Sequence, residues 1–387
     1  MRRKHKRLRK RELRKRRIIV IVSMFATTFL LASGYAAFST SLNINAKGNL
    51  KQNPITMNKL RQSAVTSGDG LYQDSIETDR YIYKGSSPKN YIKFNGNELW
   101  RIYSIENDGS IKIVKNNVTT YKIFDSSYNL SDVSPSNSVI GTRYSSSNTD
   151  FCYQNSGEEN NYKGCNAWGS KYTTLDKNGN HISSQSKISG NTSQTYTLPE
   201  SNSYLNVYLN HQFNNEKYKG LNNTKTDYEN IELTNYYNID SSYIAYIKNA
   251  TWPIGIMNFS SNSLSNMVIN EKMYQWNGKI GLLTASEYLR AHTNENYCTP
   301  LSNLATNYQT CGTYNYLSQI NYDWWLISPS ENHTRLILYV NTENKINNHD
   351  AGATRYIRPA LYLCPGITLL GKGTETNPYT INGNCSL

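Results

Sequence analysis

The chain has 387 residues and a formal net charge of +13, enough length for one to three domains. Residues 1–17 contain 12 Lys or Arg and one acidic residue, Glu12, which leaves 29 basic and 27 acidic residues in the rest of the chain. Because nucleic-acid binding needs a basic surface that neutralises phosphates, a nearly neutral body argues against nucleic acid as a partner.

Residues 18–38 form an uncharged run of 21 residues directly after the basic segment 1–17. At a rise of about 1.5 Å per residue, a helix of this length spans the hydrocarbon core of a bilayer. We therefore expect a basic cytoplasmic tail at 1–17, one transmembrane helix at 18–38 in contact with the lipid bilayer, and an extracellular carboxyl terminus, the type II arrangement. Small residues at 32–37 also suit a signal peptidase, so secretion after cleavage stays open.

Residues 39–69 are polar and predict a stalk, with a short helix near 57–64. The main domain is expected at 70–363. Alternating residues at 80–85 predict a strand, and Asn95-Gly96 and Asp108-Gly109 predict tight turns between the strands that follow. The Ser- and Asn-rich segment 125–200 is interpreted as a long insertion.

Periodicity changes after this insertion. Leu205, Tyr208, Leu209 and Phe213 share one helical face, and Ser201 or Ser203 is a candidate cap. Residues 243–252 predict a strand, 278–292 a strand and a helix, and 323–328, 335–340 and 356–363 three more strands. Residues 364–387 predict a closing strand. Strands first, helices in the middle and strands last indicate an α+β fold.

All six cysteines follow the apolar run, and an even number in an oxidising compartment favours disulfides. We expect the sequential pairs Cys152–Cys165, Cys298–Cys311 and Cys364–Cys385. Since no Cys-x-x-Cys motif or zinc-type His spacing occurs, we predict no metal centre at these cysteines.

Five segments in order resemble one family: "ELWRI" at 98–102, "LNVYLN" at 205–210, "LLTASEY" at 282–288, "DWWLISP" at 323–329 and "RPALYL" at 358–363. The set resembles an uncharacterised domain of exported proteins from low-GC Gram-positive bacteria, related to the C-type-lectin-like, sulfatase-modifying-factor type. The resemblance covers residues 70–363. It implies a C-type-lectin-like α+β domain with mostly antiparallel strands and few helices, and it fixes no activity.

Candidate ligand-binding residues gather in loops around 310–356: Tyr322, Trp324, Trp325, His333, His349, Arg355 and Arg358. Neighbouring residues on a strand face opposite sides, so one indole is expected in the core and the other at a surface or under a loop. Arg358 is expected to satisfy buried carbonyls or to pair with Asp323, with ligand contact as the alternative.

Catalytic motifs are absent from the sequence: there is no Gly-x-Ser-x-Gly elbow and no phosphate-binding glycine loop before a helix. No cofactor is therefore predicted. Calcium stays an alternative, through Asn344, Asn347, Asn348 and Asp350.

The leading hypothesis is a membrane-anchored or secreted bacterial surface protein that binds an extracellular glycan or peptide. A cell-wall-associated enzyme and a structural surface component are the alternatives. The sequence leaves the question of catalysis open and leans against it.

Overall fold

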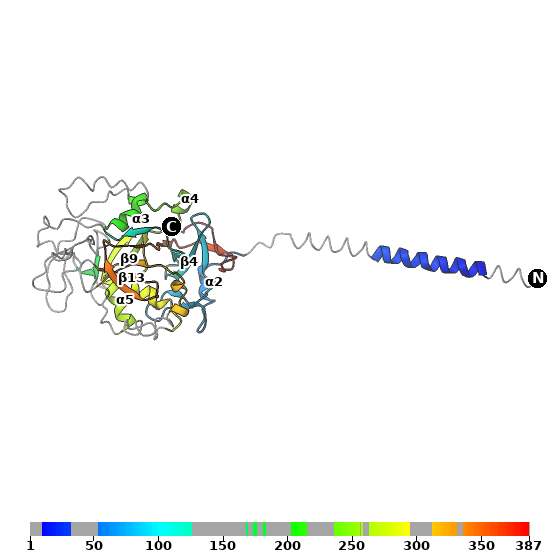
Figure 1. Ribbon diagram of the computed structural model, residues 1–387, viewed down its shortest axis with the longest axis horizontal. Helices are drawn as coiled ribbons and strands as arrows, with labels where there is room; N and C mark the ends of the chain where they lie inside the picture. Colours follow the sequence, from blue (N-terminus) through cyan, green and yellow to red (C-terminus); the bar gives the residue numbers. More distant parts are fainter. Residues whose placement is uncertain are drawn as a thin grey trace, which may run out of the picture. The chain divides into compact units, whose positions relative to one another are not determined.

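The computed structural model describes residues 10–31, 53–125, 168, 173–175, 181–182, 203–214, 236–255, 257, 263–294, 312–330 and 336–386. The chain divides into two compact units, Met1–Asn53 and Pro54–Leu387, each described here by itself (Figure 1). The expected pairs Cys152–Cys165 and Cys298–Cys311 lie outside the described residues, as does most of the insertion at 125–200.

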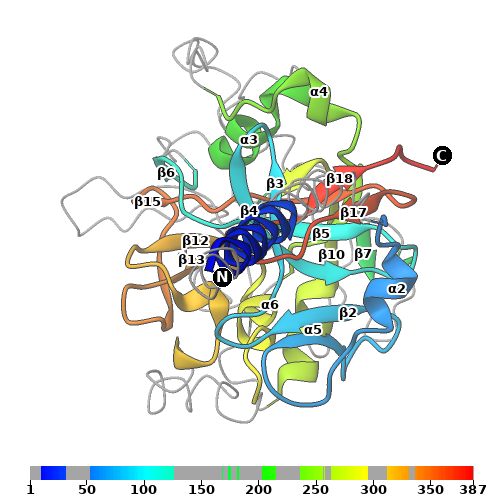
Figure 2. The same ribbon diagram turned by 90° about the vertical axis from the view of Figure 1, so that its right-hand side faces the viewer.

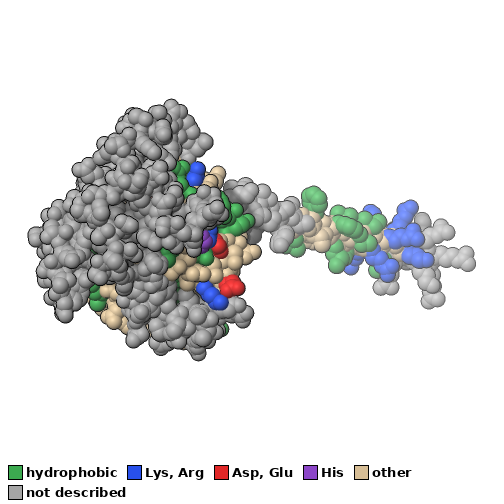
Figure 3. Space-filling view, turned by 60° about the vertical axis from the view of Figure 1, so that its left-hand side comes forward, with side chains coloured by type: hydrophobic (Ala, Val, Ile, Leu, Met, Phe, Trp, Pro, Cys, Tyr) green, Lys and Arg blue, Asp and Glu red, His purple; other side chains and the backbone are tan. Residues whose placement is uncertain are grey.

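The described part of the first unit is a helix over residues 10–31. Figure 3 shows Lys and Arg side chains gathered at one end of this helix and hydrophobic side chains along the rest of it. Within the residues that can be described, no helix combines the length and the apolar character needed to cross a bilayer. Residues 32–38 of the expected span lie outside that part of the chain.

The second unit is a mixed α+β structure with mostly antiparallel strands and few helices. Its described helices are short: α2 (Met57–Arg61), α3 (Tyr204–Asn214), α4 (Ser241–Ile244), α5 (Leu264–Lys272), α6 (Ala285–Arg290) and the 3-10 turn η2 (Tyr316–Ser318). In Figure 1, α3 and α5 lie at opposite ends of this unit, above and below the strands.

The largest described sheet has the order β1-β2-β4-β5-β16-β11, and β3 also pairs with β4. Its strands are β1 (Gly70–Gln73), β2 (Tyr81–Lys84), β3 (Tyr91–Phe94), β4 (Glu98–Ile105), β5 (Ile111–Lys115), β11 (Ile280–Gly281) and β16 (Ala360–Leu363). Asn95 and Gly96 both have positive φ, 54° and 78°, in the turn between β3 and β4. This confirms the predicted tight turn, because such turns need residues that tolerate a left-handed backbone.

A second sheet has the order β14-β13-β12-β15-β6, and its central strand β12 pairs in parallel with β15, Trp324 opposite Tyr356. Its strands are β6 (Tyr121–Ile123), β12 (Trp324–Pro329), β13 (Leu336–Val340), β14 (Ile346–Asp350) and β15 (Thr354–Tyr356). A third sheet has the order β8-β7-β10-β9, with β7 (Thr173–Leu175), β8 (His181–Ile182), β9 (Ala250–Pro253) and β10 (Tyr274–Gly278).

The predicted closing strand is a hairpin of β17 (Thr368–Leu370) and β18 (Thr380–Asn382), which lies beside β3 (Figure 2). A disulfide joins Cys364 to Cys385 on either side of this hairpin, with the two Cα atoms 5.5 Å apart.

The folded unit begins earlier than residue 70. Ile55 pairs with Leu369 of the hairpin, and Met57 and Leu60 of α2 are buried. The expected stalk over 39–69 therefore ends before Ile55, since apolar side chains at helical spacing in α2 pack into the core.

Two elements of the middle segment test the predicted periodicity. The helix α3 is confirmed, and its cap is Ser203, whose hydroxyl accepts a hydrogen bond from the Asn206 amide at 3.2 Å. The strand predicted over 243–252 is wrong in its first half. There the Asp240 carboxylate accepts from the Ser242 amide at 2.9 Å and begins the short helix α4, so the strand β9 starts only at Ala250.

Candidate functional site

The paired tryptophans are both completely buried, with 0% exposure for Trp324 and for Trp325. Their strand β12 lies between β13 and β15, and each face of the sheet is covered: the Trp324 ring contacts Tyr288 of α6, and the Trp325 ring contacts Phe124. The prediction of one indole in the core is confirmed, and the alternative of the other at a surface is wrong. Alternation places the two rings on opposite faces, but here both faces are core.

Arg358 is buried as well, and its guanidinium donates to the carbonyl oxygens of Lys115, Leu317 and Asn116 at 2.8, 2.9 and 3.1 Å. The predicted role of satisfying buried carbonyls is confirmed. Burial lowers the pKa of Arg358 to about 9. Because carbonyls occupy its donors and the Trp324 ring lies 5.1 Å away, Arg358 is a packing residue of the core.

Three other candidates lie at or near the surface. Tyr322 is 49% exposed, and its ring lies 4.5 Å from that of Tyr356, which in turn contacts Tyr121. Arg355 pairs with Asp323 at 3.4 Å.

His349 is partly buried on β14. Burial, helped by the charge of Arg355, lowers the pKa of the His349 imidazole. His333 lies outside the described residues. The contacts of these residues are therefore with neighbouring aromatic and acidic side chains, and none of them lines the cavity described below.

The four residues considered for calcium lie on β14 and in the turn before it. Asn347 and Asn348 are consecutive on β14 and therefore face opposite sides, while Asn344 lies in the preceding turn. Among the residues whose placement is described, no group of three His, Cys, Asp or Glu could hold a metal ion.

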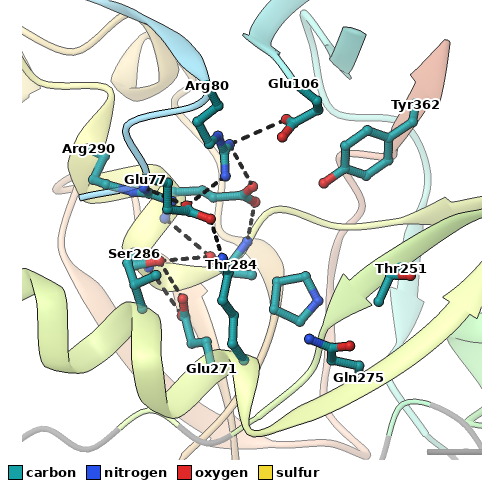
Figure 4. A pocket seen from close by; sticks show the side chains of 14 residues that line it. Glu77, Arg80, Glu106, Thr251, Glu271, Gln275, Thr284, Ser286, Arg290 and Tyr362 are labelled. Atoms are coloured by element: carbon teal, nitrogen blue, oxygen red, sulfur yellow. Dashed lines mark hydrogen bonds and ion pairs between the residues drawn. The ribbon is translucent and has the colours of Figure 1, made fainter. Parts of the chain in front are cut away.

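A cavity of about 230 Å³ brings together residues that are far apart in the sequence (Figure 4). Seven lining residues carry ionisable acid or basic side chains: Glu77, Arg80, Glu106, Glu271, Lys272, Glu287 and Arg290. Thr251, Gln275, Thr284, Ser286 and Tyr362 supply neutral polar groups. In Figure 4, Tyr362, Thr251 and Gln275 lie across the cavity from Glu77, Arg290 and Glu271.

Local structure explains how α6 enters this cavity. The Thr284 hydroxyl accepts from the Glu287 amide at 3.2 Å, and the Glu287 carboxylate accepts from the Thr284 amide at 3.0 Å. This reciprocal capping box begins α6 and holds Glu287 toward the cavity. Lys112 of β5 then reaches the Glu287 carboxylate at 2.7 Å.

The two arginines that line the cavity form ion pairs with carboxylates. Arg290 contacts Asp74 at 2.6 Å and Glu77 at 2.8 Å. Arg80 donates to Glu77 at 2.8 Å and lies 3.6 Å from both Glu106 and Glu287. Burial alone would raise the pKa of Glu287, but the charges of Lys112 and Arg80 outweigh it and hold that pKa below its usual value.

Glu271 of α5 differs from the other carboxylates that line the cavity, because only neutral groups bond to it. It is 1% exposed, and its oxygens accept from the Ser328 hydroxyl at 2.7 Å, the Ser286 amide at 3.2 Å and the Ser286 hydroxyl. It makes no ion pair with any cation whose side chain the structure describes. Burial raises the pKa of Glu271 because these neutral donors compensate only part of the lost hydration.

Some polar groups of the lining have no hydrogen-bond partner among the described residues. The Tyr362 side chain is only 7% exposed and its hydroxyl is unpaired, and the Gln275 amide on the neighbouring wall is also unpaired. The Nη2 atom of Arg80, a residue also 7% exposed, is within ion-pair distance of carboxylates but makes no hydrogen bond. A buried donor without a hydrogen bond costs free energy, which applies to Nη2 of Arg80, and the unpaired Tyr362 and Gln275 groups can also bond a polar ligand.

Comparisons with protein-family models, with curated proteins and with solved structures found no match to this chain. None of the cavity residues was a candidate ligand-binding residue, although Thr284, Ser286, Glu287 and Tyr362 lie in the family-like segments 282–288 and 358–363. The one local signal was the Thr-x-x-Glu pattern at 284–287, which marks a helix start and says nothing of a cavity.

Proposed function

We propose that this protein is an exported surface protein whose folded unit binds a small polar ligand in the cavity between α5, α6 and β16. The observation that carries the proposal is the set of cavity-lining polar groups that make no hydrogen bond among the described residues, namely the Tyr362 hydroxyl, the Gln275 amide and Nη2 of Arg80. A volume of about 230 Å³ lies below the usual range of small-molecule pockets, so the bound part of the ligand is one sugar ring or one amino-acid side chain.

The location and the finer fold are part of the same proposal. The basic segment 1–17 and the apolar run 18–38 support an anchor in the bilayer with the folded unit outside the cell. The disulfide between Cys364 and Cys385 fits an oxidising compartment. The order of the five family-like segments supports a C-type-lectin-like domain.

Location is tested on intact cells. Protease added outside should degrade the folded unit, and amino-terminal sequencing of the membrane-bound protein should begin at residue 1 or 2. A protein that survives the protease until the cells are lysed would contradict export, and a first residue after 31 in the culture medium would replace the anchor with secretion.

Ligand binding is tested with the full-length chain in detergent, by titration calorimetry against monosaccharides and single amino acids. Tyr362→Phe removes only the unpaired hydroxyl and should weaken binding of the best ligand about fivefold or more. Tyr322→Phe is the matched control, because Tyr322 lies outside the cavity. Equal weakening by both variants, or no binding of any probe, would contradict the proposal.

A second candidate function, hydrolysis of cell-wall material, is favoured by one observation. Glu271 and Glu287 line the same cavity with pKa values shifted in opposite directions, the pattern expected of a general acid and an ionised partner. Incubation with purified wall fragments should then release reducing ends or free amines, and Glu271→Gln should abolish the release. Release that is unchanged in that variant would exclude this role.

A further inference from the structure

Glu271 is the acidic group of the cavity that lacks an opposite charge. Four other carboxylates in and beside the cavity lie within ion-pair distance of Arg80 or Arg290: Asp74, Glu77, Glu106 and Glu287. Lys272 follows Glu271 in the chain, but its ammonium pairs with Glu77 instead. The cavity therefore has its cations committed on one wall and a cation-free carboxyl group on another.

The surroundings of Glu271 are fixed by two elements besides its own helix. Ser286, at the start of α6, donates through its amide and its hydroxyl, and Ser328 of β12 donates through its hydroxyl. All three donors are neutral. A buried carboxylate held only by neutral donors gains most from a positive partner, because charge-assisted hydrogen bonds are about twice as strong as neutral ones.

The free polar groups across the cavity define the rest of the ligand. The Tyr362 hydroxyl can donate or accept, and the Gln275 amide can do both at once. Neither group carries a charge, so this side suits hydroxyl or amide groups. A ligand that bridges the two sides has a positive group at one end and uncharged polar groups at the other.

We propose that the cavity binds a ligand bearing a primary ammonium group, which pairs with the Glu271 carboxylate while hydroxyl or amide groups reach Gln275 and Tyr362. This inference rests on the proposed function and names its ligand class. Two sources share the chemistry: an amino sugar with a free amine, and a basic amino-acid side chain. When the ammonium arrives at protonated Glu271, the carboxyl group loses its proton to the buffer and the ion pair forms.

The experiment compares each amine with its acetylated form on the full-length chain by titration calorimetry. The probes are glucosamine against N-acetylglucosamine, and lysine against Nε-acetyllysine. We expect one of the two amines to bind at least about tenfold more tightly than its acetylated counterpart, as the loss of a charged hydrogen bond predicts. Repeating the titration in buffers of different ionisation enthalpy should show proton release at acidic pH that declines as the pH rises.

The variant Glu271→Gln should bring each amine and its acetylated form to within about twofold, since an amide of the same shape cannot form the ion pair. Glu343→Gln is the matched control, because Glu343 is an exposed carboxylate outside the cavity, and it should keep the preference. If Glu271→Gln does not fold, the wild-type preference and its proton release decide the matter.

The outcomes separate the two proposals. Amines and acetylated forms that bind equally well overturn the ammonium inference and leave polar-ligand binding intact. A preference that persists in Glu271→Gln also overturns it. No binding of any of the four probes overturns this inference, and the wider set of sugars and amino acids then decides the proposed function by itself.

Discussion

The region around Arg358 and the region around Glu271 both bury an ionisable group with no opposite charge among the described residues. Arg358 has three carbonyl partners and the Trp324 ring against it. Glu271 has neutral donors on its oxygens, but it also lines a cavity. The difference is position, because Glu271 lines this cavity and Arg358 does not.

Burial of a charge therefore does not by itself mark a functional site in this protein. The core around β12 uses Arg358 as a hydrogen-bond donor to three carbonyls, those of Lys115 at the end of β5, Asn116 just after it and Leu317 in η2. The cavity presents polar groups that the fold leaves unpaired. The guanidinium of Arg358 has its hydrogen-bond partners, whereas that of Arg80 beside the cavity keeps an unpaired Nη2 atom.

The largest effect is expected from Arg358→Met. This change removes hydrogen bonds to one buried and two partly buried carbonyls and should lower the free energy of unfolding by about 3 kcal/mol. Urea unfolding followed by circular dichroism measures it. The control is Arg355→Met, where a partly exposed pair with Asp323 is lost and about 1 kcal/mol is expected. A smaller loss for Arg358→Met than for Arg355→Met would contradict the role of Arg358 as a hydrogen-bond donor that stabilises the core.

The next effect is the pH dependence of the free energy of unfolding in wild type relative to Glu271→Gln. The folded-state pKa of Glu271 is raised, so its stabilising contribution is complete below the unfolded pKa of about 4.3 and is lost as the pH rises through the folded value. Wild type should therefore lose stability relative to the variant as the pH rises from 4 to 8. Urea unfolding at each pH measures this difference.

Glu77 and Glu287, with lowered pKa values, titrate in both proteins and so cancel to first order in that comparison. Glu343→Gln serves as the control and should show no such trend. A difference that shrinks or stays flat between pH 4 and pH 8 would mean that the Glu271 carboxyl group is compensated by a charge.

The smallest effect is expected from Tyr322→Ala. Its ring is half exposed and packs on one neighbour, Tyr356, so the free energy of unfolding should fall by about 1 kcal/mol or less. Ligand affinity at the cavity should not change. A loss of binding in this variant would move the site to the tyrosine surface of Tyr121, Tyr322 and Tyr356 and would end the proposal for the cavity.

Sequence reasoning works best here where a local cause determines the structure. The turn at Asn95-Gly96 needs a left-handed backbone that these residues tolerate, and the face formed by Leu205, Leu209 and Phe213 can form only on a helix. The helix at α6 follows from its capping box. Each of these depends on residues within a few positions of one another.

The candidate site could not be obtained in this way. The cavity takes Glu77 from the first hairpin, Glu271 from α5 and Tyr362 from β16, and no local rule relates these positions. The same holds for the tryptophans: alternation on β12 gives their opposite directions, but the cover on each face comes from α6 and from residues near β6. Whether a side chain is exposed depends on which other elements cover its face of the sheet. The sequence pattern of one strand does not give this information.

The antiparallel contact between Ile55 and Leu369 has a mechanical consequence. The two residues exchange backbone hydrogen bonds of 2.8 and 2.9 Å, and Leu369 lies in the loop closed by the bond between Cys364 and Cys385. A pulling force on the chain ahead of Ile55 is therefore loaded onto a covalently closed ring rather than onto a free end. Under such a force the two hydrogen bonds to Ile55 would break first, and the bond between Cys364 and Cys385 would then limit how far the hairpin can be extended.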